Sequence, residues 1–460
     1  MTAGALPVAT REPSSESTVR SPTSPAPRPL AVTFAVIVLG FGFGATVATA
    51  ITTETAGQLR AAGGLAIFLG SISGLAGTYL ALVMVLIVSR VPYVERVLGQ
   101  DGLLRWHRRI APWPISLIVA HVVLLTIGYA EAAHAGAWHE IGTLLSSVPD
   151  VLIATIGFFI LVAVAIVSIY QIRSRMPRER WWAIHLFMYL ALGLAFAHVI
   201  VLGPSFVNHP ITRVLWGVLW FGTVGLVLIY RIGLPIFRSA RHRLVVAEIR
   251  SEGPGVVSVI CRGRKLERLA FSGGQFFEWR FLTRRMWWQA HPFSLSARPV
   301  PPYVRLTVKA VGDFTATVAK LRAGTRIAIE GPYGAFTSHA RSQKKVACLA
   351  GGIGVTAIRA LLEDLPIGTD PVVVLRASTE KDLVLLSEVE ELVRQRHGQL
   401  HALAGSRDAI GLGRLLGLVP DLVGRDVFVS GPENFVKGTV AELAKFGVPE
   451  TAIHSEVYSL

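Results

Sequence analysis

The chain has 460 residues, of which 52% are hydrophobic and 16% charged, and its mean hydropathy is +0.52. Soluble domains usually carry about 25% charged residues, so this composition excludes an ordinary soluble enzyme and indicates that much of the chain lies in lipid. The 45 basic and 30 acidic residues give a net charge of +15, yet the basic residues flank apolar runs and form no nucleic-acid-binding stripe. The two cysteines, Cys261 and Cys348, exclude a disulfide framework or a thiolate metal cage.

Residues 1–29 are rich in Ser, Thr, Pro and Ala and are too polar for a cleaved signal peptide, so they predict a disordered cytoplasmic tail. Several apolar segments follow, each long enough to cross the ~30 Å hydrocarbon core of a bilayer as a helix. They cover residues 31–52, 63–89, 109–130, 149–171, 182–203 and 213–235. We therefore predict a six-helix transmembrane bundle over residues 30–237.

Arginines are concentrated in alternate connections between these segments. The connection between the second and third segments carries Arg90 and Arg96 among others, and that between the fourth and fifth carries Arg173 and Arg175. The loop 131–148 between the third and fourth has no Lys or Arg. Because basic loops stay in the cytoplasm, we expect both termini there, in a multi-pass protein of the cell membrane.

Four histidines lie in or at the ends of two predicted spans: His107 and His121 on the third, and His185 and His198 on the fifth. Polar side chains are costly in lipid and are candidates for function there. Both helices run outward, so His107 and His185 share the inner depth. His121 and His198 share the outer depth. Since two imidazoles on facing helices supply both axial ligands of a haem iron, this arrangement predicts two stacked b-type haems with the four histidines as metal ligands.

The spacing of the histidines differs between the two helices. His107 and His121 are 14 residues apart, ~21 Å along a helix and within ~40° of the same face. His185 and His198 are 13 residues apart and ~140° apart around an ideal helix, so this pair requires either a local distortion or an adaptable imidazole angle. Histidines that are hydrogen-bonded between helices, without a metal, remain the alternative.

From residue 240 the pattern changes to short strand-like runs, and after residue 344 strand and helix patterns alternate, which is typical of a parallel sheet. Residues 291–297 read His-Pro-Phe-Ser-Leu-Ser-Ala. This segment resembles the flavin-binding signature of the ferredoxin–NADP reductase superfamily, in the variant of ferric reductases and NADPH oxidases. The resemblance implies FAD, with the Ser hydroxyl near the flavin ring. The implied FAD contacts are His291, Pro292, Phe293 and Ser294.

A second segment of the same resemblance follows the flavin signature. Gly312 precedes a helical stretch for which Thr315 is the expected cap, and a helix start of this kind suits a pyrophosphate. The family uses this segment for the FAD phosphates. The resemblance therefore adds Lys309, Gly312 and Thr315 to the candidate FAD contacts.

A glycine-rich turn at residues 350–356, Ala-Gly-Gly-Ile-Gly-Val-Thr, joins a strand to a helix, where backbone can approach a phosphate. It resembles the nicotinamide-nucleotide loop of the superfamily. The implied contacts are Gly351, Gly352, Gly354 and Thr356. Arg376 and the pair Ser406-Arg407 lie where NADPH-specific relatives contact the 2′-phosphate, so NADPH is favoured over NADH; two surface arginines remain the alternative.

Ser430-Gly431-Pro432 resembles the family's Cys-Gly-Pro turn beside the nicotinamide, with Ser in place of the sulfur. The oxidases carry a terminal Phe over the flavin, and Tyr458 is the nearest aromatic residue to that position here. Ser430 and Tyr458 are therefore the candidate catalytic residues, with Tyr458 expected to stack on FAD. Gly431 and Pro432 are candidate nucleotide contacts.

The resemblance as a whole implies a multi-domain membrane protein. The six-helix transmembrane bundle is followed by a β-barrel FAD-binding domain over residues 240–338 and an α/β, Rossmann-like nucleotide-binding domain over residues 344–460. Electrons would pass from cytoplasmic NADPH through FAD and two b-type haems to an outer acceptor, either oxygen, giving superoxide, or a ferric chelate. The alternative is a relay subunit that hands electrons to an extracytoplasmic partner protein. Membrane lipid is an expected partner and nucleic acid is not.

Overall fold

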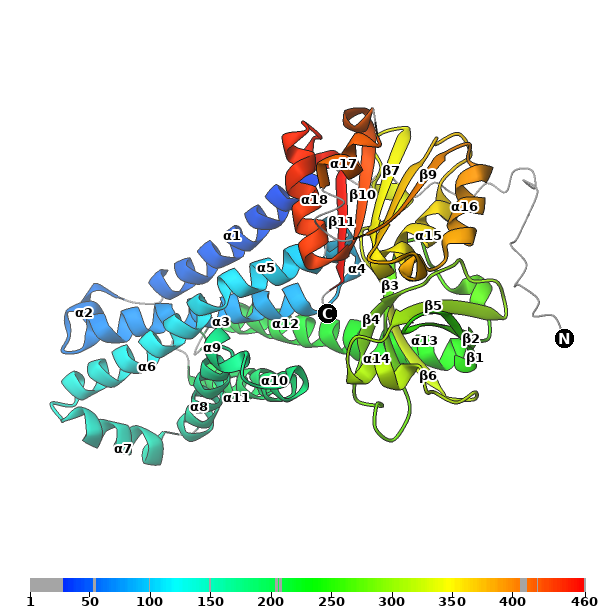
Figure 1. Ribbon diagram of the computed structural model, residues 1–460. Coiled ribbons are helices and arrows are strands. Elements are labelled where there is room, and N and C mark those ends of the chain that lie inside the picture. Colours follow the sequence, from blue (N-terminus) through cyan, green and yellow to red (C-terminus); the bar gives the residue numbers. More distant parts are fainter. Residues whose placement is uncertain are drawn as a thin grey trace. The chain divides into compact units, whose positions relative to one another are not determined.

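The structure is a computed structural model that divides into two compact units, Ser24–Ile232 and Gly233–Leu460 (Figure 1). The residues it describes are 28–52, 55–98, 100–148, 150–202, 206, 209–405, 412–419 and 421–458. Most of the predicted tail and the pair Ser406-Arg407 lie outside the described residues.

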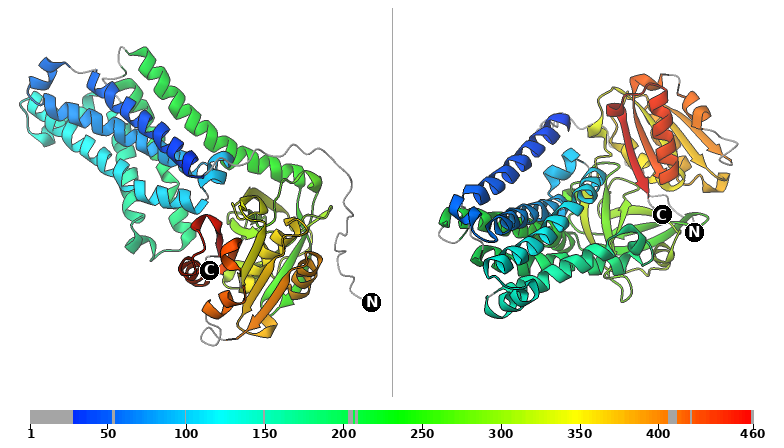
Figure 2. Two further views of the ribbon diagram at one scale, coloured as in Figure 1. Left: turned by 90° about the horizontal axis from the view of Figure 1, so that it is seen from above. Right: turned by 90° about the vertical axis from the view of Figure 1, so that its left-hand side faces the viewer.

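The first unit consists of helices in its described residues, and long helices run alongside one another in it (Figure 2). Its longest helices are α1 (Arg28–Thr52), α3 (Gly64–Val88), α6 (Pro112–Ala132), α8 (Val151–Val167), α11 (Phe187–Leu202) and α12 (Pro210–Val227). Short helices lie between them: α2 (Ala56–Arg60), α4 (Pro92–Leu98), α5 (Gln100–Ile110), α7 (Ala137–Ser147), α9 (Tyr170–Arg173) and α10 (Arg178–His185).

Five helical stretches among the described residues are long and apolar enough to cross a membrane, and the number rises to 6 if the bent pair α7–α8 counts as one span. The five are Thr33–Thr52, Gly64–Val88, Gly102–Ala132, Glu179–Ile200 and Pro210–His242. The fourth predicted span corresponds to α8, which has only 17 residues. The prediction of a multi-helix membrane domain is confirmed, with five to six candidate spans.

Glycines let helices of this unit pack closely. A Cβ on Gly63 of α3's N-cap would lie 1.9 Å from the carbonyl oxygen of Gly128 on α6, and one on Gly77 would lie 2.9 Å from Ile118 Cγ1. Helices in lipid associate through such close contacts because no hydrophobic force drives them together. The absence of side chains at these glycines therefore lets α3 pack closely against α6. Both helices lie beside one of the histidine sites described below.

The second unit begins with α13 (Leu234–His242) and a six-stranded β domain. Its strands are β1 (Val245–Gly253), β2 (Val256–Arg262), β3 (Phe276–Phe281), β4 (His291–Ser294), β5 (Tyr303–Lys309) and β6 (Ile327–Tyr333). They form two antiparallel sheets, β1-β2-β5 and β4-β3-β6. Isolated bridges join the sheets at both edges, Val245 to Arg326 and Leu295 to Leu306, and so close the predicted barrel. Trp279 is fully buried inside it.

The remainder of the second unit is an α/β domain. Its strands β7 (Lys345–Gly351), β8 (Val372–Ala377), β9 (Gln399–Ala404), β10 (Arg425–Pro432) and β11 (Ile453–Tyr458) form one parallel sheet of order β11-β10-β7-β8-β9. Helices α15 (Val355–Asp364) and α16 (Leu386–Gln395) cover one face, and α17 (Leu412–Gly417) and α18 (Glu433–Lys445) the other (Figure 1). Ligands of such sheets bind at the carboxyl ends of the strands, where the predicted nucleotide residues lie.

Candidate functional site

The four membrane histidines come together as two pairs. The ring centroids of His107 on α5 and His185 on α10 are 6.3 Å apart, with an angle of 72° between the ring planes. Those of His121 on α6 and His198 on α11 are 6.4 Å apart, at 73°. The same two pairs were predicted from the sequence, because the members of each pair are expected at the same depth in the bilayer.

The fifth span has a local irregularity between His185 and His198, which each face a histidine of the third span. Helix α10 ends at His185 and α11 begins at Phe187, and Leu186 between them forms a turn. An ideal uninterrupted helix would direct the two imidazoles ~140° apart. The turn at Leu186 is a local distortion of the kind that this spacing allows.

The geometry of each pair fits an iron held between two imidazoles. A metal–imidazole bond is about 2 Å long and the nitrogen lies about 1.1 Å from the ring centre, so two imidazoles on one metal have centroids up to about 6.2 Å apart, close to the separations observed here. The Nδ1 atom of His121 lies 2.8 Å from the carbonyl oxygen of Gly70, and an Nδ1–H donated there directs Nε2 toward a metal. His185 Nδ1 is similarly 3.3 Å from Ser168 Oγ.

The predicted flavin strand is β4, which pairs with β3 in the barrel. The ring of His291 stacks on Phe314 with centroids 3.7 Å apart. Trp279 Nε1 donates a 3.0 Å hydrogen bond to the carbonyl oxygen of Phe293. Pro292 is exposed, whereas Ser294 is buried at the end of the strand. These contacts hold the backbone of the signature in an extended form.

The segment expected to hold the FAD phosphates differs from the prediction in one respect. The N-cap of α14 (Asp313–Val318) is Gly312, and Thr315 is the third residue of the helix. Thr315 Oγ1 accepts hydrogen bonds from the backbone nitrogens of Val311 (2.9 Å) and Gly312 (3.0 Å). Thr315 is therefore not the N-cap residue. From the third position of the helix, its side chain accepts hydrogen bonds from the two backbone nitrogens that precede the helix. Lys309 Nζ lies 3.8 Å from the Asp382 carboxylate.

The nucleotide loop and the Ser-Gly-Pro turn pack against each other at the sheet's carboxyl edge. A Cβ on Gly354 would lie 2.2 Å from the Ser430 carbonyl oxygen, and one on Gly431 would lie 2.9 Å from the Gly351 carbonyl oxygen. Only glycine permits this approach. Gly352 adopts a φ of +53°, in the left-handed region. Pro432 follows at the end of β10.

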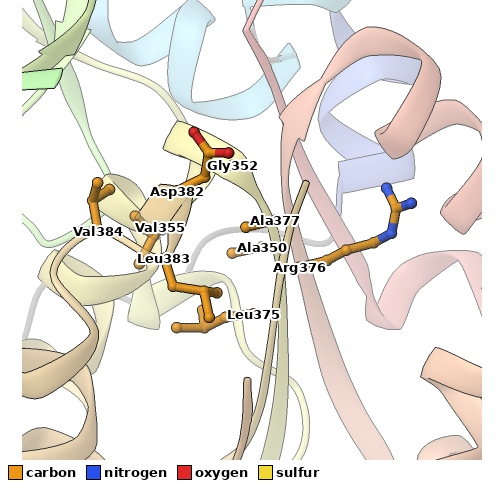
Figure 3. A pocket seen from close by; sticks show the side chains of 9 residues that line it. All are labelled: Ala350, Gly352, Val355, Leu375, Arg376, Ala377, Asp382, Leu383 and Val384. Carbon is orange, nitrogen blue, oxygen red and sulfur yellow. The ribbon is translucent and has the colours of Figure 1, made fainter. Parts of the chain in front are cut away.

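A small pocket lies beside this loop, and its lining includes Gly352 and Asp382 (Figure 3). Arg376 also lines it, but its guanidinium extends away from Asp382 and Leu383 (Figure 3). Alternation along β8 explains this direction, since Leu375 faces the core under α15 and α16.

Tyr458 meets residues of the other predicted motifs. Its hydroxyl lies 3.2 Å from Ser294 Oγ and 3.5 Å from Thr356 Oγ1. Burial of the hydroxyl, followed by the negative charge of Glu456, raises the pKa of Tyr458, so the phenol stays protonated at neutral pH. Ser430, whose side chain is buried, pairs in register with Glu456 across β10 and β11. Four motifs far apart in sequence thus converge at one place.

The comparison with known proteins agrees with this architecture. Residues 73–196 match the family described as ferric reductase like transmembrane component, and residues 246–337 match the family described as FAD-binding domain. The chain is also 25% identical over 160 residues to NADPH oxidase 3 of Rattus norvegicus, which covers 32% of this chain and 27% of that protein. The chain thus resembles a ferric reductase-like transmembrane component followed by an FAD-binding domain, with NADPH oxidase and reductase homologues.

The chain is similar to reductase components as well. It is 26% identical over 184 residues to the glycine betaine monooxygenase reductase subunit of Pseudomonas aeruginosa, covering 36% of this chain and 50% of the relative. It is 29% identical over 227 residues to the ferredoxin reductase component of 3-ketosteroid-9-alpha-monooxygenase of Mycolicibacterium smegmatis, covering 46% and 63%. The chain thus spans between half and two thirds of these relatives' own length.

Among solved structures, the FAD/NAD-binding domain of nitric oxide dioxygenase from Vibrio cholerae is similar to this chain. The TM-score is 0.42 and the identity 20%, over 47% of this chain and 99% of that domain. The predicted family, the FAD-binding domain and the multi-pass membrane character are confirmed by the family matches.

One residue of the site was missed by the sequence reasoning. Glu456 Oε1 lies 3.4 Å from Ser294 Oγ, next to the predicted flavin contact. It stands two positions before Tyr458, and residues at this spacing lie on the same face of a strand. The alternation of residues along β11 was therefore the signal that could have identified Glu456.

Proposed function

We propose that this protein carries electrons across the cell membrane, from cytoplasmic NADPH through FAD and two b-type haems to an outer acceptor, oxygen or a ferric chelate. The observation that carries the proposal is the assembly of the membrane histidines into two pairs with centroid separations of 6.3 and 6.4 Å, which suit one iron each. When bound, FAD would take a hydride from NADPH and deliver single electrons, which the haems would relay.

His107 and His185 would hold the inner haem, and His121 and His198 the outer one. The chain's own contribution is the fixed direction of the imidazoles. Gly70 accepts from His121 at 2.8 Å, which supports a neutral ring with Nε2 toward the metal. The arginine-rich connections support an orientation in which the reductase domains lie in the cytoplasm.

In the reductase unit, Ser294, Thr356 and Tyr458 would arrange flavin and nicotinamide. The protonated phenol of Tyr458 can donate to the Ser294 or Thr356 hydroxyl, and either bond restrains the aromatic ring in an orientation from which it can stack on the flavin. Glu456 would accept a hydrogen bond from the Ser294 hydroxyl and so orient that hydroxyl. Ser430, beside Glu456 in register, would line the nicotinamide position.

The remaining nucleotide contacts follow from the glycine loop. The approach of Gly351 and Gly354 to the Ser-Gly-Pro turn supports a site in which backbone lies against the nucleotide. Arg376, Ser406 and Arg407 remain the proposed contacts of a 2′-phosphate, which would favour NADPH over NADH.

An optical spectrum of the detergent-purified chain, recorded anaerobically before and after NADPH, tests the proposal. We expect oxidised flavin and two b-type haems, all reduced by NADPH. His121→Ala and His198→Ala should each remove one of the two haems. Retention of both haems in either variant would contradict the ligand assignment, and a purified chain that stays colourless in the Soret region after growth with ample haem would refute the electron path.

Turnover distinguishes the acceptor. Reduction of oxygen or ferric citrate by the purified chain alone would support a small-molecule acceptor. Reduction of the haems by NADPH without turnover of either acceptor would favour the alternative, a relay subunit that serves an extracytoplasmic partner protein.

A further inference from the structure

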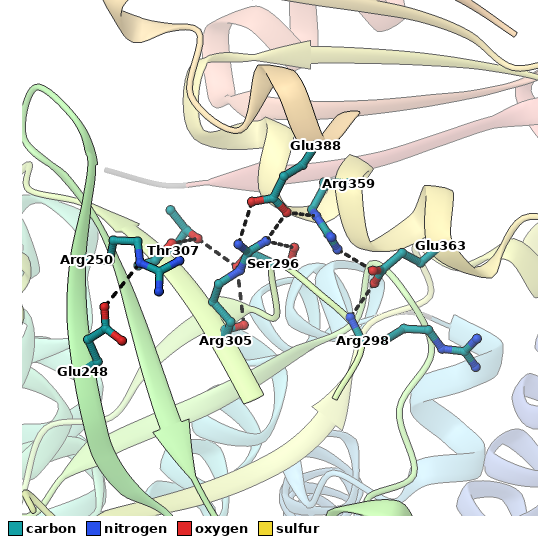
Figure 4. Close-up of polar contacts among 10 residues, drawn as sticks. Glu248, Arg250, Ser296, Arg298, Arg305, Thr307, Arg359, Glu363 and Glu388 are labelled. Carbon is teal, nitrogen blue, oxygen red and sulfur yellow. Dashed lines mark hydrogen bonds and ion pairs between the residues drawn. The ribbon is translucent and has the colours of Figure 1, made fainter. Parts of the chain in front are cut away.

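A chain of ion pairs joins the barrel to the α/β domain within the second unit (Figure 4). Arg305 of β5 makes a two-pronged contact with Glu388 of α16: Nη1 to Oε1 and Nη2 to Oε2, each 2.7 Å. Glu388 Oε2 also accepts from Arg359 Nε of α15 at 2.7 Å. One carboxylate thus bridges a barrel arginine and an arginine of the nucleotide-binding domain.

The arginines of this bridge are buried. Arg305 is 8% exposed and Arg359 is 5% exposed. Burial opposes ionisation of Glu388, but hydrogen bonds and charge from Arg305 and Arg359 outweigh it, so the pKa of Glu388 is lowered and the carboxylate is charged at neutral pH. Removal of the Glu388 charge alone would leave Arg305 buried without its counter-charge, which is strongly destabilising for this arrangement of the two domains.

Each end of the bridge continues to a cofactor motif. On the barrel side, Arg305 Nε donates to Ser296 Oγ at 3.1 Å and Nη2 donates to the Ser296 carbonyl oxygen at 3.2 Å. Ser296 is two residues beyond Ser294, the predicted flavin contact. The flavin strand and the bridge are therefore parts of one hydrogen-bonded assembly.

On the nucleotide side, Arg359 lies in the first turns of α15, three residues beyond Thr356. Its Nη1 is 2.7 Å from Glu363 Oε1, and Glu363 Oε2 accepts from the backbone nitrogen of Arg298 at 2.5 Å. Arg298 follows directly on the segment 291–297. A second link between flavin segment and α15 thus runs parallel to the first.

We infer that Glu388 is a positioning residue for hydride transfer: by joining Arg305 to Arg359 it sets the separation between the flavin strand and the nucleotide loop. The inference rests on the proposed function, because it concerns the step from NADPH to FAD. Hydride transfer is steep in donor–acceptor distance, and a misplacement of ~1 Å in an active site can cost up to ~100-fold in rate. Arg305, Arg359 and Glu388 are not among the predicted cofactor contacts, so the ion pairs would act on this distance through the backbone segments that they join.

The test uses the purified full-length chain and stopped-flow reduction of FAD by NADPH. Glu388→Gln removes the charge but keeps the size of the side chain. We expect its FAD reduction at saturating NADPH to slow at least ~10-fold. FAD content and the Kd for NADP⁺ should stay within twofold of the unmodified chain, since none of the three bridge residues is a predicted cofactor contact. Glu388→Asp, which keeps the charge on a shorter stem, should recover part of the rate.

Glu391→Gln is the matched control. It lies on the same helix and pairs with Arg394 on the surface, so it should reduce FAD at the unmodified rate. A rate of FAD reduction in Glu388→Gln within twofold of the unmodified chain overturns the inference. If Glu388→Gln loses FAD, the Glu388→Asp variant decides: loss of FAD from this variant as well overturns the inference, because Glu388 would then be needed for the fold and not for positioning. Failure of NADPH to reduce FAD in the unmodified chain and in Glu391→Gln, while dithionite does so, would instead refute the proposed function.

Discussion

Replacement of Gly74 of α3 with alanine tests whether His121 is a haem ligand, because the new methyl group would displace the imidazole ring. Gly74 faces the imidazole directly. The new Cβ would lie 2.4 Å from His121 Nδ1 and 2.8 Å from its Cε1. Non-bonded heavy atoms rest at about 3.5–4.0 Å, so the ring must retreat by about 1 Å or more.

The surroundings leave His121 little freedom to absorb that displacement. Its Nδ1 is held 2.8 Å from the Gly70 carbonyl oxygen, and α3 cannot simply move away because Gly77 packs against Ile118. Overpacking of this kind costs about 1–3 kcal/mol in well-packed interiors. A metal–imidazole bond tolerates no displacement of 1 Å, so the outer haem should be lost and the inner one kept.

The assay is the number of b-type haems per purified chain, measured from the optical spectrum. We expect about two in the unmodified protein and about one in Gly74→Ala. Gly222→Ala on α12 is the control, because a Cβ at Gly222 meets no atom within 4 Å. Two haems with an unchanged spectrum in Gly74→Ala would refute the placement of His121 as a ligand.

Three further outcomes are expected. Burial raises the pKa of Cys348 to about 12, so a maleimide at pH 8 should leave it unlabelled in folded protein and label it on unfolding, as mass spectrometry can show. Arg425 holds the pKa of Asp421 at about 2, below its unfolded value, so this carboxylate stabilises the fold above about pH 4 and loses that effect toward pH 2. Asp421→Asn should reduce the fall in melting temperature between about pH 4 and pH 2. The same fall in the variant as in the unmodified chain would contradict a stabilising role of the ion pair. Gly354→Ala, whose Cβ would lie 2.2 Å from the Ser430 carbonyl oxygen, should abolish FAD reduction by NADPH while dithionite still reduces the flavin.

Features that depend on short stretches of chain were predictable. A span needs only about 20 consecutive apolar residues, and its orientation depends on adjacent arginines, so the membrane helices could be located without knowledge of their packing. The alternation of strand and helix likewise predicted β7, α15 and β8. The pairing of histidines by depth needed only the length of the helices that carry them.

Other features have no local signal. Arg305 and Glu388 are 83 positions apart, and nothing near either residue indicates its partner. The turn at Leu186 is compatible with the geometry of the histidines, but no proline or glycine marks it. Thr315 was expected as a cap, and whether a threonine caps from outside a helix or reaches back from within depends on where the helix begins.

The amino-acid sequence by itself determined the membrane spans, the order of the domains and the cofactor motifs, because hydropathy, charge and glycine turns act over a few residues. Only the tertiary structure decided which side chains meet: Tyr458 with Ser294, and Glu388 with Arg305 and Arg359. The reason is that contacts between distant segments depend on how strands and helices pack, and packing is a property of the whole fold.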